Sequence, residues 1–492
     1  MKSVLYNDSG KLLKVFMHEY YSEYPQEGYV EQDPVTWKDA LEDVLCKMGD
    51  YCSDQNLKVD ALSVTSQRSS LIPMDENGEP LCKAIMWQDK RTLPQCDKLI
   101  EEFGLDYFYQ KTGLRINPYF VLPKILWLQE NETEIFNKAV KFIGVMDYVV
   151  KLLTDAYVTD HSQACRTCLM DIKEFKWDPE LLKLGNIQEE QLPKLVAPGT
   201  VAGGLVSDLA ERANLAAGIP VVLGGGDQQA SAIALGVIKQ GSAEANTGTG
   251  SFVLSAVDKP YFDKENRVLL QAAAIPGKWI MEAGIFNTGA VYRWFRNNFY
   301  KELDGQSNAY LVMNEEAQNS KPGANGIMMI PHFQGSAAPF WNPLAKGVFF
   351  NLSLDDTRGD FARSILEGIS LEIAVNIKLI QKIIGDLEVV SVAGGMTNAD
   401  LFCEIQANSF DRKVARYENP EASSLGAAMI AAVSLGVYKD FEEAFARMVQ
   451  NKPKIFEPDA KLVEIYRHIY IRKMVLYDAI SVGEVYDAYV ED

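Results

Sequence analysis

Apolar and polar positions alternate in the opening residues of the chain in the way that a β-hairpin requires. Residues Ser3–Tyr6 form one arm, Asn7–Gly10 supply the turn, and Lys11–Tyr20 form the other arm. A helix is expected to follow, with Asp33 as its cap and Pro34 at its first position. The start of the chain therefore predicts a two-stranded ribbon followed by a helix.

Strands and helices continue to alternate through the first half of the chain. Leu57–Ser66 has the partial alternation of a strand, and Leu71–Asp75 and the residues up to Ile85 predict two shorter strands. Helical spacing dominates from Arg91 to about Leu184. This alternation of the two kinds of element favours an α/β architecture.

The pattern restarts after Lys239–Gly241, which we interpret as a hinge between two halves. The elements expected beyond it are strands near Glu244 and Leu269 and over Leu387–Ala393, and helices over Gly289–Tyr300, Asp360–Ile384 and Glu421–Leu435. The last of these helices consists mostly of small residues, which permit close packing on a neighbour. We predict an N-terminal domain over residues 1–238, a C-terminal domain over 239–482 and an acidic tail over 483–492.

Composition narrows the class of protein. At 492 residues the chain is too long for one ordinary core, which supports two domains. A formal net charge of −19 argues against a nucleic-acid partner. Apolar runs of signal-peptide or membrane-span length are absent, and the seven cysteines form no obvious disulfide framework, so a cytoplasmic protein is expected. Whether the chain forms a homodimer is left open.

Two short stretches carry candidate chemistry. In the first, a buried strand beginning at Val221 breaks at three glycines and presents Asp227 at the mouth of a helix. In the second, residues 246–252 form a Thr/Gly turn whose backbone N–H groups can approach an anion closely. A carboxylate base beside a phosphate-binding turn suits a phosphoryl transferase with a hydroxyl substrate. Each stretch alone is a weak signal, since both are also common tight turns.

Further stretches occur with these two in a fixed order, and together the series resembles the FGGY carbohydrate kinases. They are GYVEQDP from Gly28, AIMWQDKRT from Ala84, Asp147-Tyr148, APFWNP from Ala338 and EASSLGAA from Glu421. The resemblance implies two actin-like ATPase domains, of the ribonuclease H-like fold, with a central cleft that closes on sugar and ATP. It implies an ATP- and Mg²⁺-dependent kinase that phosphorylates a hydroxyl of a small sugar, polyol or sugar acid.

The same resemblance assigns roles to individual residues. Asp227 matches the general base, which would accept the proton of the attacking hydroxyl. The nucleotide-binding positions implied are Thr249 and Gly250 in the turn, Gly289 and Arg293 in FNTGAVYRW, and Gly394 and Gly395 after a buried strand. The acceptor-binding positions implied are Arg68, Ser69, Trp87, Tyr119, Asp227, Gln228 and Phe252. Simple core filling is the alternative for Trp87 and Phe252, and metal ligands are not assigned.

Ser69 departs from the pattern of the glycerol-kinase branch. That branch places Glu directly after the Arg, whereas Ser69 follows Arg68 here. The shorter side chain leaves more room, so a larger polyol, a ketose or a sugar acid is expected in preference to glycerol.

A second departure concerns the start of the first domain. The family begins with a strand and a D-x-G-T hairpin that contacts metal and phosphates, but Met1–Tyr6 aligns with the segment just after it. We therefore expect the first strand of this sheet to be missing and the arm at Ser3–Tyr6 to have an unpaired edge. An internal Met taken as the start or a shortened gene would explain this, and a non-catalytic sugar or nucleotide sensor is the alternative function.

Overall fold

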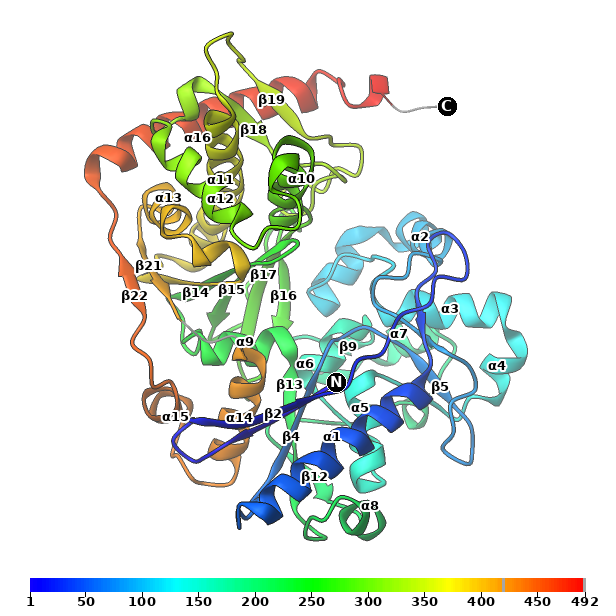
Figure 1. Ribbon diagram of the computed structural model, residues 1–492. Helices are drawn as coiled ribbons and strands as arrows, with labels where there is room; N and C mark the ends of the chain where they lie inside the picture. Colours follow the sequence, from blue (N-terminus) through cyan, green and yellow to red (C-terminus); the bar gives the residue numbers. More distant parts are fainter. Residues whose placement is uncertain (418–420, 490–492) are drawn as a thin grey trace.

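The computed structural model describes residues 1–417 and 421–489 and consists of two α/β bodies (Figure 1). The predicted hairpin is present as β1 (Lys2–Tyr6) paired antiparallel with β2 (Leu12–Met17). The predicted helix follows as α1 (Pro34–Asp54), and the Asp33 side chain caps it by accepting a hydrogen bond from the Val35 backbone N–H. Both predictions for the opening residues are confirmed.

The first body contains a three-stranded sheet in the order β12 (Val201–Gly204), β13 (Pro220–Gly226), β4 (Leu62–Ser66). Strands β13 and β4 are parallel, so their carboxyl ends meet at the same edge. The predicted strand at 57–66 is shorter than expected, since only its second half pairs. One face of this sheet packs on α1 and α5 (Val145–Thr154) through apolar side chains such as Leu41 and Val149.

Helices dominate the region that follows, as predicted, but short strands separate them. The helices are α2 (Leu93–Thr112), α3 (Val121–Asn131), α4 (Thr133–Lys138), α5 and α7 (Pro179–Leu184). The short strands include β5 (Ile72–Met74), β6 (Ala84–Ile85), β7 (Lys141–Ile143) and β8 (Val158–Asp160).

The second body is built on a seven-stranded sheet. Its order is β16 (Leu269–Ala272), β17 (Trp279–Ile285), β15 (Ser251–Val257), β14 (Ser242–Thr247), β20 (Val389–Ala393), β21 (Lys413–Arg416), β22 (Lys454–Phe456). The main helices are α10 (Gly289–Phe299), α12 (Arg358–Ile384), α13 (Asp400–Phe410) and α16 (Ala460–Val482). The strands and helices predicted beyond residues 239–241 are therefore confirmed.

The helix of small residues is α14 (Ala422–Ser434), and it returns to the first body (Figure 1). It lies against β13, β4 and α9 (Asp227–Ala234), and α15 (Phe441–Met448) lies beside it. The approach is so close that a Cβ atom on Gly426 would lie 1.8 Å from the carbonyl oxygen of Ala230. The predicted close packing of this helix is confirmed, and its partner is the helix that begins at Asp227.

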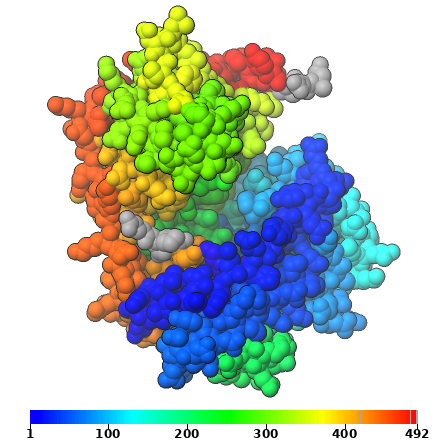
Figure 2. All heavy atoms as spheres, viewed as in Figure 1, coloured from blue at the N-terminus to red at the C-terminus, as the bar shows by residue number. Residues whose placement is uncertain are grey.

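Strands β1 and β4 face each other without pairing. In the parts of the chain described, β1 pairs only with β2, and β4 is an edge strand of its sheet. A cavity of about 1620 Å³ separates them and continues to Asp227 and to the second body. Figure 2 shows the amino-terminal residues, in dark blue, lying across the outside of the first body. The expected unpaired edge of the hairpin is thus present.

Candidate active site

Two parallel strands deliver the central residues of the site. Strand β4 ends at Ser66 and is followed, after Gln67, by Arg68 and Ser69, while β13 ends at Gly226 and is followed by Asp227. The carboxyl ends of parallel strands meet at one edge of a sheet, where α/β proteins usually bind ligands. Residues that are far apart in the sequence therefore share this edge.

Asp227 is the first residue of α9 and is half-buried in the cavity. Its Oδ1 atom accepts a hydrogen bond from the backbone N–H of Gln228 at 2.8 Å. Burial raises the pKa of the Asp227 carboxyl, and the nearby Arg68 guanidinium partly opposes this rise. A carboxylate with a raised pKa that is open to a cavity is suited to accept a proton.

A buried cluster of one carboxylate and two guanidinium groups lies next to this position. Arg68 Nη2 lies 3.3 Å from Glu282 Oε2, and Arg166 Nη1 lies 3.2 Å from Glu282 Oε1. Burial opposes ionisation of Glu282, but the charges of Arg166 and Arg68 outweigh it and hold the pKa of that carboxyl below its usual range. Arg68 also donates to Gln271 Oε1 at 2.5 Å. The cluster joins residues of both halves of the chain.

Ser69 connects this cluster to the predicted aromatic residues. Its hydroxyl accepts from Arg166 Nε at 3.4 Å, and its backbone has a φ of 72°. Lys124 Nζ donates to the carbonyl oxygens of Ser69 and Tyr119, both at 2.7 Å. The Tyr119 ring meets the Trp87 ring edge-on, with 5.8 Å between centroids. The structure therefore brings Arg68, Ser69, Trp87 and Tyr119 together.

Three amide side chains in this region have unused hydrogen-bonding atoms. Gln228 Oε1, Gln229 Oε1 and Gln271 Nε2 are buried and have no partner within residues 1–417 and 421–489. Gln229 Nε2 donates to Gln271 Oε1 at 3.2 Å, so these two side chains are in contact. Buried polar atoms without a partner are costly unless a ligand or water satisfies them. The arrangement is suited to an acceptor with several hydroxyl groups.

Phe252, which is predicted to bind the acceptor, lies on β15 and is partly buried. It stands opposite Gly284 of β17, on the sheet face that also carries Glu282, because residues two apart on a strand point to the same side. Its ring also packs at the border of an apolar cluster that includes Leu254. Core filling, the alternative to a binding role for Phe252, therefore accounts for part of the packing around its ring.

The predicted nucleotide-binding turn is fixed against the start of α10. The Thr249 carbonyl accepts from the N–H groups of Thr288 and Ala290, both at 3.1 Å, and the Gly248 carbonyl accepts from Gly289 N–H at 3.0 Å. A Cβ atom on Gly289 would lie 2.3 Å from the Gly248 carbonyl oxygen. Glycine is therefore needed for this contact, which leaves the Thr249 side chain exposed at the tip of the turn.

Gly394 and Gly395 follow β20, which is parallel to β14 and pairs Ala393 with Asn246. Gly394 has a φ of 97°, and a Cβ atom there would lie 2.2 Å from the Thr247 carbonyl oxygen. Both glycines line the cavity that contains Asp227. Arg293 is exposed on the second turn of α10. The six predicted nucleotide positions thus lie on three neighbouring segments of the second body.

Several residues of the site had not been identified from the sequence. Arg166, Glu282, Gln271 and Lys124 carry no local motif, and Arg166 and Glu282 are 116 positions apart. Their position follows only from the packing of the two bodies. Within the residues described, no group of three or more His, Cys, Asp or Glu side chains is arranged to hold a metal ion. No described helix combines the length and apolar character of a membrane span.

Both halves of the chain match one protein family, and named proteins are similar to it over most of its length. Residues 1–234 match the N-terminal domain of the FGGY family of carbohydrate kinases, and residues 243–435 match its C-terminal domain. Xylulose kinase of Lactococcus lactis is 30% identical over 472 residues, covering 96% of this chain and 93% of that protein. Glycerol kinase of Thermococcus gammatolerans is 31% identical over 463 residues, covering 93% and 91%.

A solved structure agrees over nearly the whole chain. Gluconate kinase from Lactobacillus acidophilus superposes with a TM-score of 0.91 at 25% identity, covering 97% of this chain and 95% of that one. Its two-domain fold confirms the predicted actin-like, ribonuclease H-like architecture. These relatives are named as kinases, and none of these names supports the alternative of a non-catalytic sensor.

Proposed function

Because the chain belongs to the FGGY family of carbohydrate kinases, enzymes that phosphorylate an alcohol group, we propose that it transfers the γ-phosphate of ATP to a hydroxyl of a small sugar, polyol or sugar acid, with Asp227 as general base. One observation carries the proposal. The half-buried Asp227 carboxylate opens into the cavity lined by Gly394 and Gly395, and the amide oxygen of Gln228 next to it has no hydrogen-bond partner among the described residues.

Asp227 accepts the proton of the acceptor hydroxyl as its oxygen attacks phosphorus. Burial raises the pKa of this carboxyl, which strengthens its carboxylate form as a base. Arg68 and Arg166 are held in place by Glu282, so they can donate to acceptor oxygens without rearrangement. Because the donors and the base are already in place, they hold the acceptor hydroxyl in the orientation that the reaction needs.

The region predicted to bind the nucleotide suits ATP because it contains several glycines, which carry no side chain. Gly250, Gly289 and Gly394 each occupy a position where a Cβ atom would meet a backbone oxygen, so the turn, α10 and the loop after β20 pack closely, backbone against backbone. Such bare backbone can approach phosphates closely. Mg²⁺, when bound with ATP, neutralises charge on the phosphates. It usually uses one or two carboxylates with water and phosphate, and the described carboxylates that line this cavity are those of Asp8, Asp60, Asp227 and Glu421.

The acceptor is proposed to be larger than glycerol. Ser69 has a short side chain beside Arg166, which leaves space and a donor for a further hydroxyl or a carboxylate. The orphaned atoms of Gln228, Gln229 and Gln271 also favour a ligand with several oxygen atoms. The related proteins named above act on xylulose, glycerol and gluconate, so each of these classes belongs in a test.

A panel of polyols, ketoses and sugar acids assayed by ADP release tests this proposal. We expect ATP- and Mg²⁺-dependent turnover with at least one acceptor of four to six carbons and a lower kcat/KM with glycerol. If no acceptor in the panel increases ADP release above the rate with ATP alone, the proposed activity is wrong. If glycerol is the best substrate, the interpretation of Ser69 is wrong.

A further inference from the structure

The strand that leads to Asp227 is interrupted just before it ends. The regular pairing of β13 with β4 holds up to Leu223 and resumes at Gly226, and between them two glycines of β13 lie opposite Thr65 alone. Such a β-bulge takes the extra residue out of the hydrogen-bond ladder and redirects the side chains next to it. The backbone that leads to Asp227 therefore needs contacts other than those of the sheet.

Two hydroxyl groups bind a single peptide group at this bulge, the one that joins Gly225 to Gly226. Thr65 Oγ1 donates to the Gly225 carbonyl oxygen at 2.8 Å. On the other side, the Gly226 N–H donates to Ser162 Oγ at 2.9 Å. This peptide bond is trans, so its C=O and N–H groups point in opposite directions. A hydroxyl on each side therefore fixes the orientation of the whole peptide plane.

The Ser162 hydroxyl is itself held in one direction by Asp160, which is fully buried. Ser162 Oγ donates its hydrogen to Asp160 Oδ1 at 2.5 Å. The same carboxylate oxygen accepts from the backbone N–H groups of Ser162 and Gln163, at 2.8 and 3.1 Å. Because its hydrogen is directed at the carboxylate, the hydroxyl oxygen has lone pairs left for the Gly226 N–H. Ser162 is therefore a fixed acceptor for this peptide group.

The packing around the bulge leaves the peptide group little freedom. Gly225 has a φ of 77°, and a Cβ atom on it would lie 2.7 Å from the Cβ atom of Ala274 in the second body. A Cβ atom on Gly226 would lie 2.5 Å from Arg68 Cδ. The second body and the Arg68 side chain thus enclose the bulge, and its conformation requires glycine.

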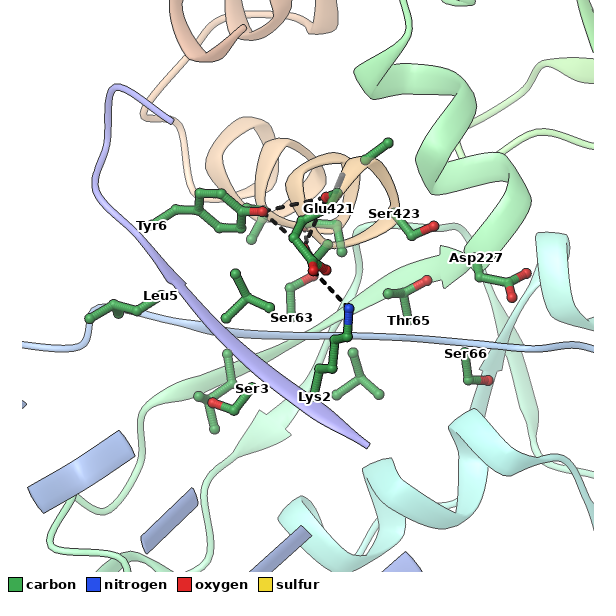
Figure 3. A pocket seen from close by; sticks show the side chains of 18 of the residues that line it. Lys2, Ser3, Leu5, Tyr6, Ser63, Thr65, Ser66, Asp227, Glu421 and Ser423 are labelled. Atoms are coloured by element: carbon green, nitrogen blue, oxygen red, sulfur yellow. Dashed lines mark hydrogen bonds and ion pairs between the residues drawn. The ribbon is translucent and has the colours of Figure 1, made fainter. Parts of the chain in front are cut away.

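We propose that Thr65 and Ser162 are positioning residues for Asp227, which comes directly after Gly226. They hold the peptide plane in one orientation, and this orientation directs the Asp227 carboxylate into the cavity. Thr65 and Asp227 both line that cavity (Figure 3). The inference rests on the proposed role of Asp227 as general base. Loss of either hydroxyl should lower kcat, because a small displacement of a reacting group reduces the rate, and should leave substrate binding nearly unchanged.

Two substitutions of Thr65 separate its hydrogen bond from its packing. Thr65→Val keeps the shape of the side chain but cannot donate to the Gly225 carbonyl, whereas Thr65→Ser keeps the hydroxyl and removes a methyl group. We expect kcat to fall about tenfold or more in Thr65→Val and to stay within about threefold in Thr65→Ser, with KM for ATP and acceptor within about twofold in both. A larger loss of kcat in Thr65→Ser than in Thr65→Val would overturn the proposal, because packing would then be what matters.

Ser63→Ala is the matched control. Ser63 lies on the same strand and donates to the Ala427 carbonyl at 2.8 Å, so its loss removes one bond from a hydroxyl to a carbonyl without touching the bulge. It should lower Tm about as much as Thr65→Val does, while kcat stays within about twofold of the parent. Equal losses of kcat in Ser63→Ala and Thr65→Val would also overturn the proposal.

A double variant tests whether the effect passes through Asp227. Ser162→Ala should lower kcat as Thr65→Val does, and Thr65→Val added to Asp227→Asn should cause no further loss, because no base is left to position. A further tenfold loss in the double variant would contradict the proposal. If Asp227→Asn alone keeps kcat near that of the parent, the base assignment is wrong and this inference falls with it. A low kcat in Asp227→Asn with parental kcat in Thr65→Val and Ser162→Ala would overturn the positioning role alone.

Discussion

Arg166 and Glu282 form an ion pair of 3.2 Å that joins the two bodies of the molecule at the proposed acceptor site. The same carboxylate also holds Arg68 at 3.3 Å, so one buried negative charge orients two guanidinium groups. Removing a partner from such a cluster leaves charge unpaired in a buried place, which costs more than losing an exposed pair.

The variant Glu282→Gln tests the orienting role of this carboxylate. An uncharged amide cannot hold both guanidinium groups, and a hydrogen bond to a charged group contributes about 1.5–3 kcal/mol. We expect kcat/KM for the acceptor to fall roughly tenfold to a hundredfold, with KM for ATP nearly unchanged. The control is Glu265→Gln, which removes an exposed carboxylate 3.4 Å from Arg267. Equal effects on ATP and acceptor would argue for a general structural defect instead.

Ser69→Glu tests the proposed basis of acceptor choice. The new carboxylate would lie beside the Arg166 guanidinium and fill the space left by the serine. We expect kcat/KM for glycerol to rise about tenfold or more and that for the larger acceptor to fall. The matched control is Ser69→Gln, which adds the same bulk without charge. If both variants change the two substrates in the same way, charge at position 69 does not determine the choice.

Gly394→Ala tests the nucleotide-binding loop. The added Cβ would lie 2.2 Å from the Thr247 carbonyl oxygen at a φ of 97°, so the loop must move. Strain of this kind costs about 1–3 kcal/mol, and we expect ATP to bind at least about tenfold more weakly by calorimetry. Gly395→Ala is the control, because a Cβ atom there meets nothing within 4 Å. Equal ATP affinity in Gly394→Ala and the parent would remove this loop from the nucleotide site.

The sequence predicts features that depend on neighbouring residues, but it does not predict contacts between residues that are far apart in the chain. Local signals were sufficient for the hairpin, for the helix capped by Asp33 and for the strand that ends before Asp227. The position of α14 on the first body could not be predicted, because a stripe of small residues shows that a helix packs closely but not on which partner. The pairing of Arg166 with Glu282 was missed for the same reason, since only the folded chain brings residues 116 positions apart together.

Glu244 provides a prediction for stability against pH. It is fully buried on β14, and neither of its carboxyl oxygens has a hydrogen-bond partner in the described part of the chain. Burial, with a contribution from the Glu282 charge, raises its pKa to about 8. Between about pH 4.5 and pH 8 the folded state keeps this proton, whereas the unfolded state has released it. The contribution of Glu244 to the free energy of unfolding therefore becomes less favourable as pH rises from about 4.5 to about 8.

Glu244→Gln removes this titration while keeping the shape of the side chain. The Tm of the variant relative to the parent should therefore be higher at pH 8 than at pH 5, as measured by calorimetry at both values. A difference in Tm that does not change with pH would show that Glu244 does not titrate in this range.

Asp227→Asn tests the central claim most directly, because the amide keeps the shape of the side chain but cannot accept a proton. General-base catalysis contributes about 10²–10⁴ in rate, so kcat with the best acceptor should fall at least about a hundredfold. The Kd for ATP, measured by calorimetry on the same preparation, should stay within about twofold, since the proposed loss is in proton transfer rather than in binding. A kcat within about threefold of the parent would contradict the assignment of Asp227 as the base.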